Sequence, residues 1–244
     1  MNIKKLNEEL SKLINESEEK TFADWYGEDL TGQTYEGSIN CADEGITSLK
    51  GAPAKVTGDF DCSWNNLTSL EGTPEEVDGY FGCYNNKLTS LEGGPKEVGK
   101  HFDCSRNNLT TLEGAPQKVG GYFDCNNNQL TSLEEAPAKV TGSFDCDYNK
   151  LTSLEGAPAK VTGNFLCSFN NLTTLEGAPQ EVGGSFECYS NNLTSLEGAP
   201  EYVGGNFWCA HNKLTSLKGA PQKVGGSFYC NDELKKEARK MGLL

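Results

Sequence analysis

The side chains of this sequence that could act as nucleophiles or soft metal ligands are ten cysteines and two histidines. A nucleophilic cysteine needs a base within hydrogen-bond distance, most often a histidine. The nearest pair along the chain is Cys209 and His211, but the repeat pattern described below turns the cysteine inward and leaves the histidine on a rim. The sequence also lacks a phosphate-binding glycine loop and an H-E-x-x-H zinc motif. We therefore expect no catalytic residue, no cofactor and no metal site, and a protein that is not an enzyme.

The cysteines follow one another at intervals of 21 residues without exception. They are Cys41, Cys62, Cys83, Cys104, Cys125, Cys146, Cys167, Cys188, Cys209 and Cys230. Each repeat has a single cysteine slot, and side chains that stack in one direction fit disulfide geometry poorly. We expect free, buried, reduced thiols, which pack as small apolar groups and are typical of a reducing compartment. Disulfide pairs or a metal array are the alternative.

A strict period of this length is typical of a solenoid, in which each repeat buries its apolar face only against its neighbours. Phenylalanine stands two residues before the cysteine from Phe60 to Phe228, and this alternation predicts a short strand with both side chains inward. Two leucine columns and a valine column, from Val56 to Val224, complete the predicted core. Proline and glycine between these columns predict an extended or 3-10 return segment without α-helix.

An asparagine stands three residues after the cysteine in eight of the repeats. The eight are Asn65, Asn86, Asn107, Asn128, Asn149, Asn170, Asn191 and Asn212. The string F-x-C-x-x-N-x-L resembles the leucine-rich repeat core L-x-L-x-x-N-x-L. With N-x-L-T-S-L and a proline soon after, it is similar to the short leucine-rich repeats of bacterial effectors and of phage-encoded and bacterial repeat proteins. The resemblance implies an asparagine ladder that hydrogen-bonds backbone groups of adjacent coils, which buried turns also require.

The columns and the resemblance together predict a repeat solenoid, the leucine-rich-repeat horseshoe of the α/β class. We expect one continuous parallel β-sheet on the concave face, an extended or 3-10 convex side, and α-helical caps at both ends. The predicted organisation is an N-terminal helical and aromatic cap (1–36), a solenoid of nine full 21-residue repeats (37–230) and a C-terminal helical cap (231–244).

The two cap predictions rest on local patterns. Residues 2–19 have the apolar spacing of an amphipathic helix, which covers the first coil or, alternatively, binds a partner. Phe22, Trp25, Tyr26 and Leu30 follow and are expected to seal the first coil. After Cys230 the register breaks, and the sequence from Asp232 to Gly242 has the start and stop residues of a helix.

Some repeat positions hold different residue types in different repeats. The fold does not constrain the residue type at these positions, so they indicate the binding surface. Strand alternation places three of these columns on the outward, concave face of the sheet and a fourth on its rim. The candidate partner-binding residues are Asp61, Trp64, Tyr80, Tyr84, Asp103, Tyr122, Asp124, Asp145, Asp147, Tyr148, Leu166, Phe169, Glu187, Tyr189, Trp208 and Tyr229.

This face divides into an acidic part at the early and middle repeats and an aromatic part at the late repeats. Exposed aromatic groups in a patch are typical of protein-binding surfaces. One alternative is a solvated sheet face with incidental aromatic residues. Another is a calcium site, since calcium takes several carboxylate oxygens, but no glycine-rich D-x-D loop accompanies the aspartates.

The formal net charge of −14, from 21 basic and 35 acidic residues, disfavours nucleic acid and anionic membranes as partners. The polar N-terminus has no apolar core of a secretory signal, which favours a cytoplasmic location in a bacterial or phage-infected host cell. We expect a monomeric, non-enzymatic module that binds a protein partner, preferably a basic one, in a phage-host or bacterial interaction. The alternative function is an adhesin or a structural component of a virion or cell surface.

Overall fold

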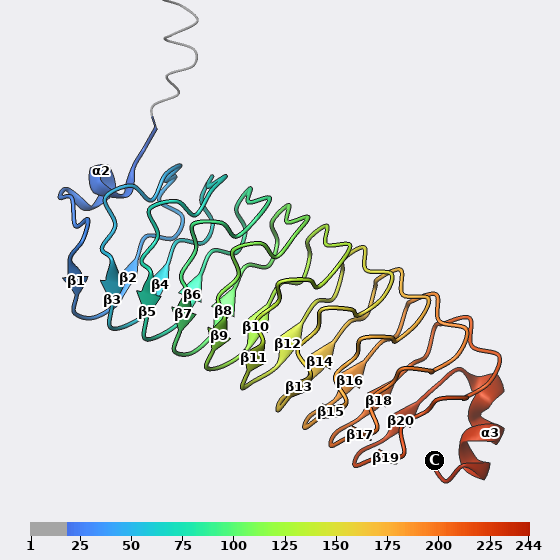
Figure 1. The fold of residues 1–244 in the computed structure, drawn as a ribbon. Coiled ribbons are helices and arrows are strands. Elements are labelled where there is room, and N and C mark those ends of the chain that lie inside the picture. The colour runs from blue at the N-terminus through green and yellow to red at the C-terminus, as the bar shows by residue number, and fades with distance from the viewer. Residues whose placement is uncertain (1–18) are drawn as a thin grey trace, which may run out of the picture.

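The computed structural model describes residues 19–244, which form a stack of coils with two parallel β-sheets. Figure 1 shows the coils side by side in an elongated array, with α2 (Phe22–Tyr26) at one end and α3 (Lys235–Lys240) at the other. The helix expected over residues 2–19 lies outside the described residues except for Glu19. The parallel solenoid that the repeat pattern predicts is confirmed, and its curvature into a horseshoe stays a prediction.

The first sheet, called here the Phe/Cys sheet, contains the strand predicted from the phenylalanine column. Its ten strands, in spatial order, are β2 (Ile39–Asn40), β4 (Phe60–Asp61), β6 (Phe81–Gly82), β8 (Phe102–Asp103), β10 (Phe123–Asp124), β12 (Phe144–Asp145), β14 (Phe165–Leu166), β16 (Phe186–Glu187), β18 (Phe207–Trp208) and β20 (Phe228–Tyr229). Successive phenylalanine rings stack inside the coil, for example Phe102 on Phe123 with ring centroids 5.3 Å apart. The predicted inward cysteines are free and buried, and Cys104 Sγ donates a hydrogen bond to the carbonyl of Asp124 in the next coil (3.2 Å).

A second sheet, the Val sheet, runs along the return segments. Its ten strands, in spatial order, are β1 (Thr34–Tyr35), β3 (Lys55–Val56), β5 (Glu76–Val77), β7 (Glu97–Val98), β9 (Lys118–Val119), β11 (Lys139–Val140), β13 (Lys160–Val161), β15 (Glu181–Val182), β17 (Tyr202–Val203) and β19 (Lys223–Val224). The prediction of a single sheet was therefore wrong, and no 3-10 segment occurs in residues 37–230.

The second sheet forms because the return segments approach one another closely just after each valine. A Cβ atom added at Gly120 would overlap the carbonyl oxygen of Gly99 in the neighbouring coil. Proline prevents ladder pairing only at its own position. Pro53 therefore does not affect the residues that begin two positions later, and Lys55 and Val56 pair with Glu76 and Val77.

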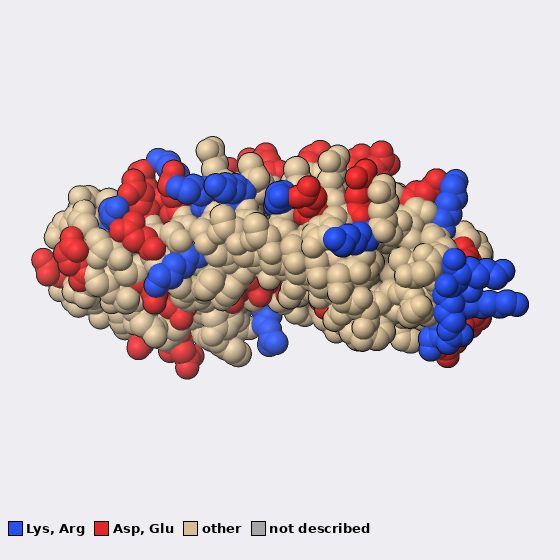
Figure 2. Space-filling model, turned by 90° about the horizontal axis from the view of Figure 1, so that it is seen from below, with Lys and Arg blue, Asp and Glu red and all other residues tan. Residues whose placement is uncertain are grey.

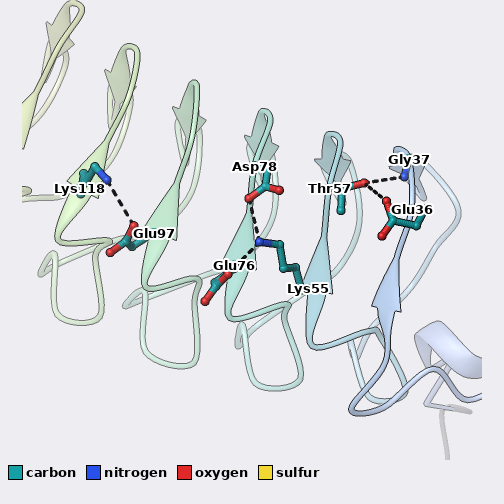
Figure 3. Close-up of polar contacts among 8 residues, drawn as sticks. All are labelled: Glu36, Gly37, Lys55, Thr57, Glu76, Asp78, Glu97 and Lys118. Carbon is teal, nitrogen blue, oxygen red and sulfur yellow. Dashed lines mark hydrogen bonds and ion pairs between the residues drawn. The ribbon is translucent and has the colours of Figure 1, made fainter.

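Oppositely charged side chains of neighbouring coils form ion pairs along the Val sheet (Figure 3). Lys55 Nζ lies 3.1 Å from Glu76 Oε2 and 3.2 Å from Asp78 Oδ1. Lys118 Nζ lies 3.5 Å from Glu97 Oε2. Pairs of this exposure contribute little to stability, about 0–1 kcal/mol each. They do balance the charge of this sheet, in contrast with the Phe/Cys sheet described below.

The asparagine ladder is confirmed. In the middle of the array, Asn128 Oδ1 accepts a hydrogen bond from the backbone N–H of Leu109 (2.9 Å). Its Nδ2 donates to the carbonyls of Cys104 and Cys125, both at 3.1 Å. The amide therefore joins two coils and pairs backbone groups that water cannot reach.

The residue before each ladder asparagine has a left-handed backbone. Its φ lies between 53° and 56° in eight coils, although none of these residues is glycine. They are Trp64, Asn85, Arg106, Asn127, Tyr148, Phe169, Ser190 and His211. This conformation costs a non-glycine residue about 1–2 kcal/mol, and it directs the rim side chains away from the core.

Both ends of the described array have helical segments packed on them. At the N-terminal end Phe22 is fully buried and stacks on Phe60, with ring centroids 6.2 Å apart. At the other end η1 (Asp232–Leu234) precedes α3, whose Ala238 is buried. Glu237 Oε1 accepts a hydrogen bond from the Leu217 N–H (2.9 Å), a donor that bonds a backbone carbonyl of the following coil in inner repeats.

Candidate protein-binding face

The register of the Phe/Cys sheet places the residues between phenylalanine and cysteine in one outward row. Along this row Asp103 is paired with Asp124 and Asp124 with Asp145. The row continues through Leu166, Glu187, Trp208 and Tyr229. Because neighbouring parallel strands lie about 4.8 Å apart, these side chains form a continuous surface. We call it the Asp/aromatic face, and its use by a partner stays a prediction.

The acidic part of this face is held by hydrogen bonds from the backbone of the following residues. Asp124 Oδ1 accepts from the Asn126 N–H (3.0 Å), and Asp145 Oδ1 accepts from the Asp147 N–H (2.9 Å). Asp147 Oδ1 accepts from the Ser168 N–H in the next coil (2.6 Å). One oxygen of each carboxylate is therefore fixed to the frame, which orients the side chains along the face.

These carboxyl groups titrate at unusually high pH. Partial burial, followed by the charges of Asp145 and Asp103, raises the pKa of Asp124 to about 7. Partial burial and the Asp145 charge raise the pKa of Asp147 to about 8. The pKa values of Asp103 and Asp145 are also raised, chiefly by burial. Burial and mutual repulsion both disfavour the charged forms.

The aromatic part consists of rings in contact from one coil to the next. Tyr148 stacks on Phe169 with centroids 4.2 Å apart, and Phe169 meets Tyr189 edge to face at 5.0 Å. Trp208 stacks on Tyr229 at 3.8 Å and an interplanar angle of 20°. Tyr148, Phe169 and Tyr229 are exposed. These pairs keep the rings in fixed orientations while one side of several of them faces solvent.

Two hollows lie on the face. The first, of about 570 Å³, lies between rim aromatics such as Trp64 and Tyr148 and the carboxylates of Asp103, Asp145 and Asp147. The second, of about 850 Å³, is lined by Trp208 and Tyr229 and by Lys235 and Arg239 of α3.

Several predicted residues occupy less accessible places. Tyr80 is half-buried and lies over Gly82, where an added Cβ would overlap the tyrosine hydroxyl. Burial raises the pKa of Tyr80 far above its ordinary value. Tyr122 stacks on His101 at 4.1 Å, and its N–H donates to His101 Nδ1. Of the remaining predicted residues, Trp64 and Tyr84 meet edge to face at 6.0 Å, and Asp61 lies half-buried at the start of the row.

Sequence reasoning missed the basic residues that border the two hollows. Arg106 lines the hollow among the aspartates, and its rim position was visible in the repeat alignment. Lys235 and Arg239 belong to the broken register after Cys230, where no repeat column relates them to the face. Their spacing of four residues on a helix places them on the same side, which is the signal that could have indicated a common role.

The residues considered for catalysis are separated. Cys209 is buried and its Sγ donates to the Tyr229 carbonyl (3.3 Å), whereas His211 is exposed on the rim. Burial raises the pKa of the buried inner thiols, Cys125 among them, well above the ordinary value, which opposes thiolate formation. Among residues 19–244 no set of three His, Cys, Asp or Glu side chains is placed to hold a metal ion. Nor does any helix in that range have the length and apolar character to cross a bilayer.

No family model and no curated protein matches the sequence. Among solved structures, YopM from Yersinia enterocolitica WA-314 is similar over 75% of this chain and 54% of its own, at 17% identity and a TM-score of 0.35. The functional domain of InlJ from Listeria monocytogenes, described as including a cysteine ladder, is similar over 78% of this chain and 59% of its own, at 17% identity and a TM-score of 0.36. This chain thus spans little more than half of either one. The repeat solenoid implied by the leucine-rich-repeat resemblance is established here by the strand pairing and asparagine ladder of the chain itself.

Proposed function

We propose that this protein is a non-enzymatic binding module that holds a protein partner on its Asp/aromatic face. A basic segment of the partner lies over the carboxylates from Asp103 to Asp147. Apolar and aromatic groups of the partner lie on the rings from Tyr148 to Tyr229. One observation carries the proposal: the acidic row continues directly into an aromatic row on the same sheet.

The carboxylate row supports a basic partner on energetic grounds. Half-buried like charges on adjacent strands destabilise the free protein, as the raised pKa values of Asp124 and Asp147 show. A lysine or arginine placed between these carboxylates restores their charged forms and relieves the repulsion. On the Val sheet, by contrast, Lys55, Lys118 and Lys160 already supply counter-charges from the chain itself.

We also propose a cellular location and an oligomeric state for the protein. Ten free, buried thiols are compatible with a reducing cytoplasm, and the leucine-rich-repeat resemblance favours a bacterial or phage-infected host cell. The excess of acidic residues disfavours nucleic acid and anionic membranes as partners. We propose that the protein acts as a monomer.

Affinity capture from a bacterial lysate, followed by measurement of the captured protein's affinity, tests this function. Tyr229→Ala should weaken binding by about 2 kcal/mol, roughly thirtyfold, as expected for an aromatic hot spot. The matched control is Tyr202→Ala, because both rings are 39% exposed but Tyr202 lies on the Val sheet. Equal losses for the two variants, or no loss for Tyr229→Ala, would place the binding surface elsewhere.

A further inference from the structure

The larger hollow has two walls of different chemistry. One wall is the shelf formed by Trp208 and Tyr229, whose rings stack at 3.8 Å. The other is formed by α3, from which Lys235 and Arg239 line the hollow. Its volume of about 850 Å³ lies within the range of about 300–1,000 Å³ that is typical of ligand sites.

The two cations differ in their availability. Lys235 Nζ lies 2.6 Å from Asp232 Oδ1, so its charge is already paired. Arg239 is exposed and forms no ion pair among residues 19–244. A guanidinium group presents a planar fork that binds a carboxylate through two parallel hydrogen bonds. Arg239 is therefore the available anion-binding group beside the aromatic shelf.

The surroundings restrict the anion to a small one. Glu187 also lines the hollow, and the carboxylate row continues toward Asp145. Figure 2 shows a cluster of basic side chains at the end of the molecule where α3 lies, whereas basic and acidic side chains are intermingled over the rest of this view. A polyanion would extend over Glu187 and the carboxylate row, which would repel it, whereas a single carboxylate next to an apolar side chain can pair with Arg239 and leave the rest of the row uncovered.

We propose, building on the binding function above, that this hollow takes a segment of the protein partner in which a large apolar or aromatic side chain stands next to an acidic residue. The apolar side chain lies on the Trp208–Tyr229 shelf and the carboxylate pairs with Arg239. Tyr229 lies four strands beyond Asp145, on β20 and β12 of the same sheet. That separation is about 19 Å at roughly 4.8 Å per strand, so an extended partner segment spans it with about six residues. The bound segment is therefore dipolar, with its basic residues over the aspartates and its acidic residue at α3.

Selection of peptides from a random dodecapeptide display library on the full chain tests this assignment. The enriched peptides should carry Asp or Glu within two positions of a large apolar or aromatic residue. Arg239→Glu should weaken the binding of these peptides at least tenfold. The matched control is Lys240→Glu, an adjacent exposed position of α3 that makes the same charge change but does not line the hollow, and it should change affinity less than twofold.

Four outcomes overturn the assignment. Two concern the selection: enriched peptides that lack the acidic residue, or no enrichment at all. The other two are equal losses of affinity for the two charge variants, and undiminished binding to Arg239→Glu. A comparison with Trp208→Ala separates this inference from the function on which it rests. If the peptides lose affinity for Trp208→Ala but not for Arg239→Glu, the face binds protein and the acidic-segment assignment is wrong. If neither variant weakens the binding of the peptides, the proposed function also fails at this site.

Discussion

Replacement of Asn128 by alanine is the perturbation for which the structure gives the clearest magnitude. Asn128 is 8% exposed, and four hydrogen bonds hold its amide. After the replacement the carbonyl of Cys104 keeps a donor in Asn107, and the carbonyl of Cys125 keeps one in Asn149. The buried N–H of Leu109 loses the acceptor that pairs it. One orphaned buried donor costs about 1–3 kcal/mol.

We therefore expect Asn128→Ala to lower the free energy of unfolding by about 2 kcal/mol, measured by urea denaturation. For a chain of this size that loss lowers the melting temperature by roughly 4–8 °C. Because coils couple only to their neighbours, the transition should also broaden or separate into two steps. Asn108→Ala is the control, since Asn108 is exposed and its side chain makes no hydrogen bond among residues 19–244. If the two variants unfold at the same urea concentration, the ladder does not stabilise the array as described.

Three further predictions concern the backbone, the carboxylates and the thiols. Ser190 has a φ of 53°, so in urea denaturation Ser190→Gly should be at least as stable as the wild type. Ser190→Val should be less stable, because a β-branched side chain tolerates this conformation least; the reverse order would contradict the strain. The folded-state pKa values of Asp124 and Asp147 lie at about 7 and 8, above the unfolded value of 3.8. Their contribution to stability is therefore fully present below the unfolded pKa and is lost progressively as pH rises through 7–8. Urea titrations from pH 5 to 8.5 should show this decline, and Asp124→Asn with Asp147→Asn should flatten it; an unchanged slope would contradict the assignment. A thiol reagent should titrate ten cysteines in denaturant and react slowly with the native protein, whereas a count near zero in denaturant would indicate disulfides.

Much of the core could be predicted from the sequence because each core position occurs once in every repeat, with the same type of residue in the same environment. Phenylalanine, cysteine, leucine and valine recur at fixed positions, and each column is buried as its spacing predicts. The asparagine column was predictable for the same reason, since a polar residue that recurs among apolar columns must pair with buried backbone groups. The pairing of Asn128 with Leu109 and Cys104 follows this logic.

The Val sheet and the left-handed rim could not be predicted in the same way. The proline before each valine indicates a break in the pairing of strands. It gives no sign that the pairing resumes two residues later, at Lys55 and Val56. The left-handed residues share no side-chain type, from Trp64 to Ser190, because the ladder on their C-terminal side fixes the backbone there. The helix α3, which contributes to the lining of the larger hollow, lies outside the repeats, so no column indicates that Arg239 and Trp208 line the same hollow.

The central claim is that the Asp/aromatic face binds the partner, and matched charge reversals on the two sheets test it most directly. One variant changes Asp103, Asp124 and Asp145 to Lys, and the other changes Glu76, Glu97 and Glu181 to Lys on the Val sheet. Both variants replace three acidic residues with lysines and so change the formal net charge equally. The association rate constant with the captured partner, measured at several salt concentrations, therefore isolates the effect of position. We predict slower association with a weakened salt dependence for the first variant and rates close to the wild type for the second. Equal changes in the two variants, or unchanged rates in the first, would contradict the claim.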